Sequence, residues 1–161
     1  LFLDERAGAV QLAIFGGKLT TYRKLAETVV ERLSPWLHCR RGAWTDSEAL
    51  PGGGFAAAAS EAELQRTFAA WPQLPTALLG ELFRRHGLAV ADVLGDARTL
   101  ADLGLDFGGG LYQREAEYLI AEEWAMAAGD ILWRRTKTGL HMSPAQRDEF
   151  ADWFARRRAA A

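Results

Sequence analysis

The sequence contains a single cysteine, Cys39, among 161 residues, which excludes a disulfide framework within the chain. It also lacks any apolar run close to the ~18 residues that a membrane-crossing helix needs, and it shows no signal-peptide pattern. The formal net charge is −2 and there is no basic block, which argues against a nucleic-acid partner. With 49% hydrophobic and 25% charged residues, the composition indicates a folded, water-soluble domain, and the cysteine usage fits a reducing compartment.

A second absence concerns nucleotide binding. The glycine clusters at 52–54 and 108–110 do not have the G-x-G-x-x-G spacing, and neither lies between a predicted strand and helix. The chain therefore carries no phosphate loop for a dinucleotide. It also begins at Leu1, inside an apolar stretch and without a methionine. From this beginning we expect an excised piece of a longer protein.

Two short strands are predicted at the beginning of the chain, at residues 1–3 and 10–15, with a polar turn at 4–8 between them. Both faces of the second strand are apolar, which is typical of a strand inside a larger sheet. A lone hairpin is marginally stable in water. We therefore predict that residues 1–17 are the tail end of a sheet whose other strands lie outside this chain.

The remainder, residues 18–161, is predicted to form a bundle-like helical domain. Apolar residues recur at helical spacing from Tyr22 to Leu37, and Pro35 is expected to end this helix. A second long helix is predicted at 111–127. Capping boxes are predicted at two further helix starts, Ser60 with Glu63 and Ser143 with Gln146. The predicted fold class is mainly α, with a short N-terminal β-hairpin.

The segment between the second strand and the first helix is Gly16-Gly17-Lys18-Leu19-Thr20-Thr21-Tyr22-Arg23. Glycines let a ligand approach the backbone, and the first N–H groups of a helix have no partner within the helix. Thr20 or Thr21 can cap this helix. Together with the helix dipole, the charge of Lys18 favours an anion, such as a phosphate or the N1–O2 edge of a reduced flavin. An ordinary βα turn with a surface lysine is the plainer alternative.

The amino-acid sequence of this segment resembles a motif of the quinone-linked, FAD-dependent glycerol-3-phosphate dehydrogenases. In that family the motif joins the last strand of the FAD domain to a C-terminal helical domain. The likeness continues in order over nearly the whole chain. Further matching segments are Ala43-Trp44-Thr45, Leu50-Pro51-Gly52-Gly53, Asp102-Leu103-Gly104, Asp106-Phe107-Gly108, Glu115-Ala116-Glu117-Tyr118-Leu119, Glu123-Trp124-Ala125 and Ile131-Leu132-Trp133-Arg134-Arg135-Thr136-Lys137.

The resemblance implies a parent enzyme that oxidises glycerol 3-phosphate to dihydroxyacetone phosphate by hydride transfer to FAD and passes the electrons to quinone. It implies that Gly17, Lys18, Leu19 and Thr20 bind the flavin and that Lys18 also faces the substrate. The other ligand-binding groups would belong to an N-terminal FAD domain, so this chain alone is expected to hold no FAD and to be inactive. The parent is expected to be cytoplasmic, as a peripheral protein on the cytoplasmic face of the membrane, and a homodimer is left open.

Two alternatives stand beside this interpretation. One is a stand-alone helical interaction module without a redox role. The other is the same domain of a glycerol-3-phosphate oxidase, which passes electrons to oxygen. The chain contains neither a quinone site nor an oxygen site, so its residues do not separate the dehydrogenase from the oxidase.

Titratable side chains elsewhere favour plainer roles than catalysis. The histidines are scattered without metal-ligand spacing, and a metal site would need distant groups to converge. The four acidic residues crowded on the predicted 111–127 helix favour a solvated or ion-paired face. The histidines are His38, His86 and His141, and Cys39 is the thiolate that could join them in a metal site. The acidic residues are Glu115, Glu117, Glu122 and Glu123.

The remaining candidates for binding or contact roles are basic residues and tryptophans. Arg23, Arg134, Arg135 and Lys137 either bind phosphate or form contacts within the domain and to the missing FAD domain, and their roles are left open. Arg134 is also predicted to pair with Asp130, four residues earlier. The six tryptophans suit a packed core. Any tryptophan left exposed would mark a surface that the FAD domain, a second subunit or the membrane covers in the parent.

Overall fold

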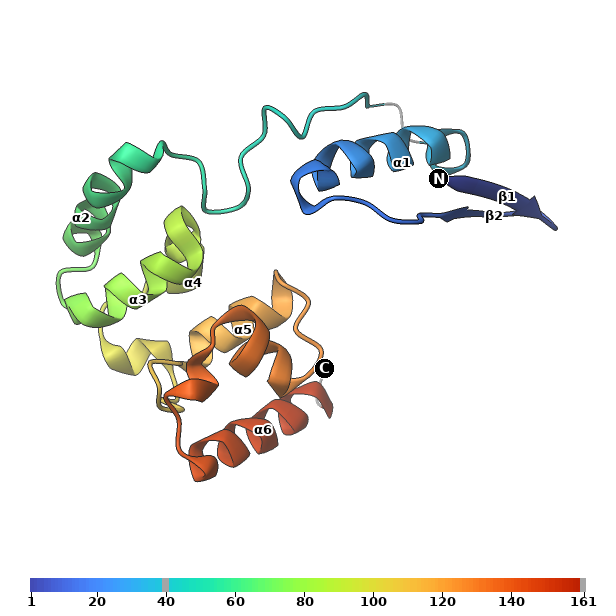
Figure 1. Ribbon diagram of the computed structural model, residues 1–161. Coiled ribbons are helices and arrows are strands. Elements are labelled where there is room, and N and C mark those ends of the chain that lie inside the picture. Colours follow the sequence, from blue (N-terminus) through green and yellow to red (C-terminus); the bar gives the residue numbers. More distant parts are fainter. Residues whose placement is uncertain (39–40, 160–161) are drawn as a thin grey trace. The chain divides into compact units, whose positions relative to one another are not determined.

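The computed structural model describes residues 1–38 and 41–159 (Figure 1). The chain forms two compact units, Leu1–Ala49 and Leu50–Ala161, called the N-terminal and the C-terminal unit below. Within the described residues there are six α-helices and one two-stranded antiparallel sheet. The predicted mainly α class with an N-terminal hairpin is therefore confirmed. None of the helices in the described ranges is long and apolar enough to cross a bilayer.

The hairpin of the N-terminal unit pairs β1 (Phe2–Arg6) with β2 (Ala9–Ala13). Only Ala7 and Gly8 form the turn, and both have positive φ angles, 51° and 81°, as in the two-residue turns that match the twist of paired strands. The predicted polar turn at 4–8 was therefore too long. Its first three residues belong to β1, because a strand with one solvated face accommodates polar side chains.

Helix α1 spans Tyr22–Leu37, and a 3-10 turn over Leu19–Thr21 precedes it. The prediction that Pro35 ends this helix was wrong, because the helix continues for two residues and ends at His38, whose φ is 51°. A proline has no N–H for the carbonyl four residues earlier. Here the Ser34 hydroxyl donates to the Glu31 carbonyl at 2.7 Å, so the acceptor that Pro35 leaves free is satisfied.

The N-terminal unit has no core of its own. None of its described residues is fully buried, and several large apolar side chains are open to solvent, among them Phe15 at 79%, Leu19 at 88% and Tyr22 at 63%. A hairpin and one helix cannot bury enough apolar surface to stand alone. This exposure fits the expectation that residues 1–17 belong to a larger sheet, which stays a prediction.

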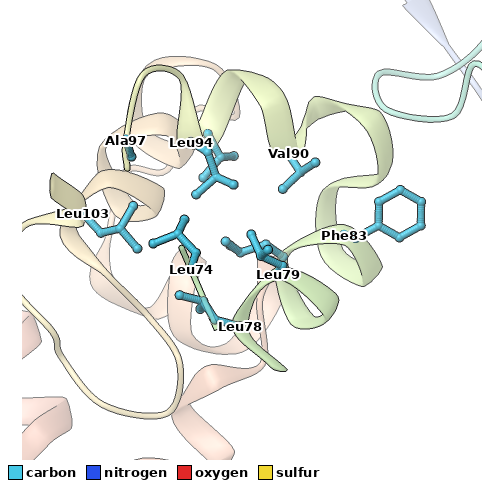
Figure 2. Packing of buried hydrophobic residues seen from close by; sticks show 10 residues of the cluster. Leu74, Leu78, Leu79, Phe83, Val90, Leu94, Ala97 and Leu103 are labelled. Carbon is cyan, nitrogen blue, oxygen red and sulfur yellow. The ribbon is translucent and has the colours of Figure 1, made fainter. Parts of the chain in front are cut away.

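The C-terminal unit holds five helices and two clusters of buried side chains. The helices are α2 (Ser60–Ala70), α3 (Thr76–His86), α4 (Val90–Leu94), α5 (Gln113–Ala121) and α6 (Pro144–Ala159). In the first cluster, side chains from α3 and α4 such as Leu79 and Leu94 point toward one another (Figure 2). The second cluster surrounds Phe150 of α6 and includes Leu119 of α5 and Ile131.

Helix α5 is much shorter than the predicted helix at 111–127. It ends at Ala121, and a loop follows in which Trp124 has a positive φ of 54°. A π-helical turn then covers Asp130–Arg135. The helical spacing of the apolar residues continued through this loop, so the pattern concealed the break.

The two predicted capping boxes had different outcomes. At α6 the box is present, because the Ser143 hydroxyl accepts from the Gln146 N–H at 3.2 Å and the Gln146 side chain accepts from the Ser143 N–H at 2.8 Å. At α2 the prediction was wrong. A 3-10 turn over Ala57–Ala59 leads directly into the helix, so Ser60 is already helical and caps nothing.

The loop that begins the C-terminal unit is held against the end of α3 by a close backbone approach. The Leu88 N–H donates to the Gly52 carbonyl at 2.9 Å, and a Cβ placed on Gly52 would lie 1.9 Å from the His86 carbonyl oxygen. Gly52 has a φ of 77° and Gly87 a φ of 57°. Both glycines are needed here because a side chain would meet backbone, which cannot move aside.

We expect Gly52→Ala to release this loop. The added methyl group collides with the His86 carbonyl, so the hydrogen bond from Leu88 breaks, and amide exchange at Leu88 should accelerate more than about tenfold. Gly54→Ala is the matched control, because its Cβ would meet only the Leu88 side chain, at 3.9 Å. Equal protection of Leu88 in both variants would contradict this account.

Candidate functional site

The site predicted at Gly16–Arg23 is an open, extended segment that runs into a helix. Gly16 and Gly17 have φ angles of 76° and 146°, and Lys18 is extended. A Cβ on Gly16 would meet nothing within 4 Å, and one on Gly17 would meet only the Leu25 side chain, at 3.4 Å. These glycines therefore do not serve packing within the described chain. They leave room for a ligand to approach the backbone.

The cations of this segment are Lys18 and Arg23, and of the two Lys18 has no partner among the described residues. The first turns of the 3-10 turn and of α1 contain no acidic residue, and no described residue forms an ion pair or hydrogen bond with the Lys18 ammonium. Thr21 does not cap the helix, since its hydroxyl donates to the Lys18 carbonyl at 3.2 Å, and no side-chain cap is made by Thr20 either. The predicted threonine cap was wrong. The Thr21 N–H donates to the Lys18 carbonyl at 3.0 Å, and the first N–H groups of a helix, which have no partner within it, are able to bind an anion.

Arg23, the second residue of α1, is held by contacts within the N-terminal unit. Its Nη1 donates to the Glu27 carboxylate at 2.8 Å, and the same carboxylate oxygen accepts from the Thr45 hydroxyl at 2.6 Å. Lys24 donates to the second oxygen at 3.2 Å. Glu27 thus joins α1 to the following loop. It also offsets the charge of Arg23, which leaves Lys18 as the free cation among the described residues of this segment.

These contacts make the Glu27 clamp sensitive to acid. The hydrogen bond from Thr45 lowers the pKa of Glu27 most, followed by the hydrogen bond from Lys24 and the charge of Arg23. A lowered pKa means that the clamp is complete above the ordinary glutamate value of about 4.3 and is lost as the pH falls through the lowered one. The Thr45 methyl resonance should therefore titrate with a midpoint below about 4.3. Glu27→Gln should abolish this titration, whereas Glu31→Gln on the same helix should keep it.

The known proteins that match this chain show its family. The model of the C-terminal domain of alpha-glycerophosphate oxidase matches residues 43–157. The chain belongs to this family of C-terminal domains. It is 41% identical over 153 residues to the aerobic glycerol-3-phosphate dehydrogenase of Escherichia coli (strain K12), and 42% identical over 152 residues to the D-erythritol 1-phosphate dehydrogenase of Brucella abortus (strain 2308). Each match covers 94% of this chain and 30% of the relative.

The family assignment confirms the resemblance that the sequence motifs indicated. A glycerol-3-phosphate dehydrogenase of Pseudomonas aeruginosa is also similar, at 44% identity over 135 residues. The matches span 26–30% of the length of these curated relatives. The family model begins at residue 43, so Gly16–Arg23 lies before it. The assignment of Gly17, Lys18, Leu19 and Thr20 to flavin binding stays a prediction.

The basic residues near the π-helical turn of this family domain are engaged in internal contacts. Arg134 pairs with Asp130 at 2.6 Å, as predicted. Arg135 donates to the Glu123 carbonyl, at 2.9 Å from its Nε, and Lys137 donates to the Trp133 carbonyl. All three cations make contacts within the domain, so the structure favours the local-contact interpretation of all three.

A buried ion pair that the sequence concealed connects α3 and α5. Both carboxylate oxygens of Glu115 accept from Arg85, at 2.7 and 2.8 Å, and His86 contacts the first oxygen at 2.7 Å. Glu115 is only 2% exposed. The ion pairing expected for Glu115 is present, but nothing in its helical spacing indicated burial. Arg85 and His86, 30 and 29 residues away, gave no local signal.

Within residues 1–38 and 41–159, no group of three or more histidine, cysteine or acidic side chains lies close enough to hold a metal. Cys39, the thiolate candidate, lies outside the described residues. His86 is engaged with Glu115, and its ring also meets the edge of Tyr118, with 5.6 Å between the ring centroids.

Proposed function

We propose that this chain is the C-terminal part of a flavoenzyme that oxidises glycerol 3-phosphate, or a closely related polyol phosphate, and that Gly17–Thr20 forms one edge of its flavin site. The observation that carries the proposal is the open helix N-terminus, where Lys18 has no partner among the described residues and the first turn contains no acidic residue. Such an end stabilises an anion or an electron-rich ring edge. The likeness to dehydrogenases of glycerol 3-phosphate supports the same assignment.

The residues of this segment fit FAD on chemical grounds. FAD accepts a hydride when bound, and negative charge then develops on its ring. Gly17 would let the ring approach the backbone, Leu19 and Thr20 would lie against it, and the Lys18 ammonium would stabilise the charge or the substrate phosphate. The N-terminal part of the parent would supply the remaining groups, so the chain alone is proposed to be inactive.

The acceptor and the location belong to the same proposal. The electrons would pass to quinone, which is dissolved in the bilayer. The parent would therefore be a peripheral protein on the cytoplasmic face of the membrane. A homodimer is one oligomeric state that it could form. The name of the matched family mentions an oxidase, whereas the relatives are named dehydrogenases. Oxygen is therefore the alternative acceptor.

The parent enzyme with its flavin tests these statements. It is mixed without oxygen with glycerol 3-phosphate, D-erythritol 1-phosphate or glycerol, and flavin bleaching is followed. The proposal predicts bleaching by at least one of the two phosphates and none by glycerol. Reoxidation by a soluble quinone much faster than by oxygen supports the dehydrogenase, and the reverse order supports the oxidase. Absence of bleaching by either phosphate would refute the proposed activity.

A further inference from the structure

The loop after α5 presents two large apolar side chains to solvent. Trp124 is 81% exposed and Met126 is 62% exposed, whereas Ala125 between them is buried at 1%. Trp124 also has a φ of 54°. Positive φ is uncommon outside glycine, asparagine and aspartate, and for a bulky residue it is an outlier. Asparagine or glycine would suit the turn better, so the indole is not there to stabilise the loop.

Hydrogen bonds fix this loop on both sides of the indole. Arg135 donates to the Glu123 carbonyl just before Trp124, and the Ala125 N–H just after it donates to the Leu119 carbonyl at 3.1 Å. The Asp130 carboxylate accepts from the N–H groups of Met126 and Ala127, each at 2.9 Å. The backbone is therefore held in place while the two side chains project. Such an arrangement pre-orders an anchor and reduces the entropy lost when it binds.

The size of this surface indicates what covers it. A tryptophan buries about 150–250 Å². Even with Met126 added, the loop provides far less than the ~800 Å² per partner that stable association of separate proteins needs. A covalently tethered partner has an effective concentration in the millimolar range, so a small anchor is sufficient. The chain spans about 30% of its relatives' length, and the matched domain is the C-terminal one, so such a tethered partner exists in the parent.

The charges around the loop disfavour a lipid surface. Glu122 and Glu123 precede Trp124, and both are exposed. The nearby cations Arg134 and Arg135 are engaged with Asp130 and the Glu123 carbonyl. Attachment to anionic lipid relies on free basic residues near the apolar anchor. A protein recess is the better match.

We propose that Trp124 and Met126 anchor the C-terminal unit in an apolar recess of the flavin-binding part of the same parent chain. This rests on the proposed function, because that function supplies the flavin-binding part. The anchor is independent of the Gly17–Thr20 segment, which lies in the other unit.

Photo-cross-linking in the full-length, flavin-loaded parent tests the anchor. A benzophenone amino acid is placed at position 124, and in a separate preparation at Leu105, which is 54% exposed on the same unit. We expect a cross-link from position 124 to a peptide of the flavin-binding part of the same chain, at a yield at least about fivefold above that from position 105. Cross-links between two copies, cross-links to lipid, equal yields from both positions, or no cross-link at 124 would each overturn the proposal.

Trp124→Asn provides the second readout, since asparagine keeps the left-handed turn and removes the ring. It should accelerate proteolytic cleavage between the two parts of the parent by roughly tenfold, consistent with the loss of one aromatic anchor. An unchanged cleavage rate would count against the anchor. Polyol phosphate oxidation is assayed in the unsubstituted parent. An active parent without the cross-link overturns only the anchor, whereas a parent that oxidises neither phosphate refutes the proposed function.

Discussion

Replacing Lys18 by alanine in the parent flavoenzyme is expected to lower kcat/KM for its polyol phosphate by roughly 10²–10³-fold, the effect typical of removing one group that stabilises developing charge. Lys18 has no partner among the described residues of the structure. It lies at a helix end whose first turn contains no carboxylate. Its removal leaves the charge on the flavin or the substrate without that support. Steady-state kinetics with matched flavin content measure the effect.

Two variants separate the charge at this position from other effects. Lys24→Ala removes a lysine of α1. Its side chain is 73% exposed and pairs with Glu27, so activity should change less than about twofold. Lys18→Arg keeps the charge and should retain part of the activity. A loss with Lys24→Ala as large as that with Lys18→Ala would indicate general damage to the helix and contradict the assigned role.

Replacing Glu115 by alanine is expected to reduce the free energy of unfolding of the C-terminal unit by about 3–5 kcal/mol. The substitution removes the main partner of the Arg85 guanidinium, whose side chain is 11% exposed, and the partner of His86. Arg85 then keeps only the Gly110 carbonyl at 3.2 Å and the half-exposed Glu81 carboxylate at 3.9 Å. A buried charge that loses its main partner costs more than the pair contributed. Guanidinium unfolding followed by far-UV circular dichroism measures the change.

Glu117→Ala on the same helix is the control for that variant. Glu117 accepts from the Gln113 side chain at 3.0 Å and is only partly buried, so its loss should cost less than about 1 kcal/mol. Similar costs for Glu115→Ala and Glu117→Ala would show that the buried pair does not hold α3 against α5.

The sequence predicted the features that depend on neighbours along the chain. The stripe of α1, the mainly α class and the Ser143–Gln146 capping box all rest on spacings of three or four residues, and the structure confirms them. Local patterns failed where a tertiary contact or an unusual φ decided the outcome. Helix α5 ends at Ala121 within an apolar repeat that would suit a longer helix, and the positive φ of Trp124 lies in the loop that follows.

In the candidate site too, the features with a local sequence signal were predicted and those set by tertiary contacts were not. Two glycines followed by a helix start located the open segment, because this signal is local. The Arg23–Glu27 pair has the local i,i+4 spacing, but the part of Thr45 in it was not predictable, since Thr45 lies 22 residues after Arg23 in an irregular loop. That contact matters, because it removes Arg23 as a competing anion ligand and leaves Lys18 as the free cation of the segment among the described residues.

The central claim is that the Gly17–Thr20 segment contacts the flavin, and the midpoint potential of the flavin in the parent tests it most directly. In an anaerobic redox titration, Lys18→Met should make the two-electron potential more negative by about 30 mV or more, equivalent to about 1.4 kcal/mol of lost stabilisation of the reduced ring. Lys24→Met should leave the potential within a few millivolts of the wild type. A potential unchanged by Lys18→Met would contradict the claim.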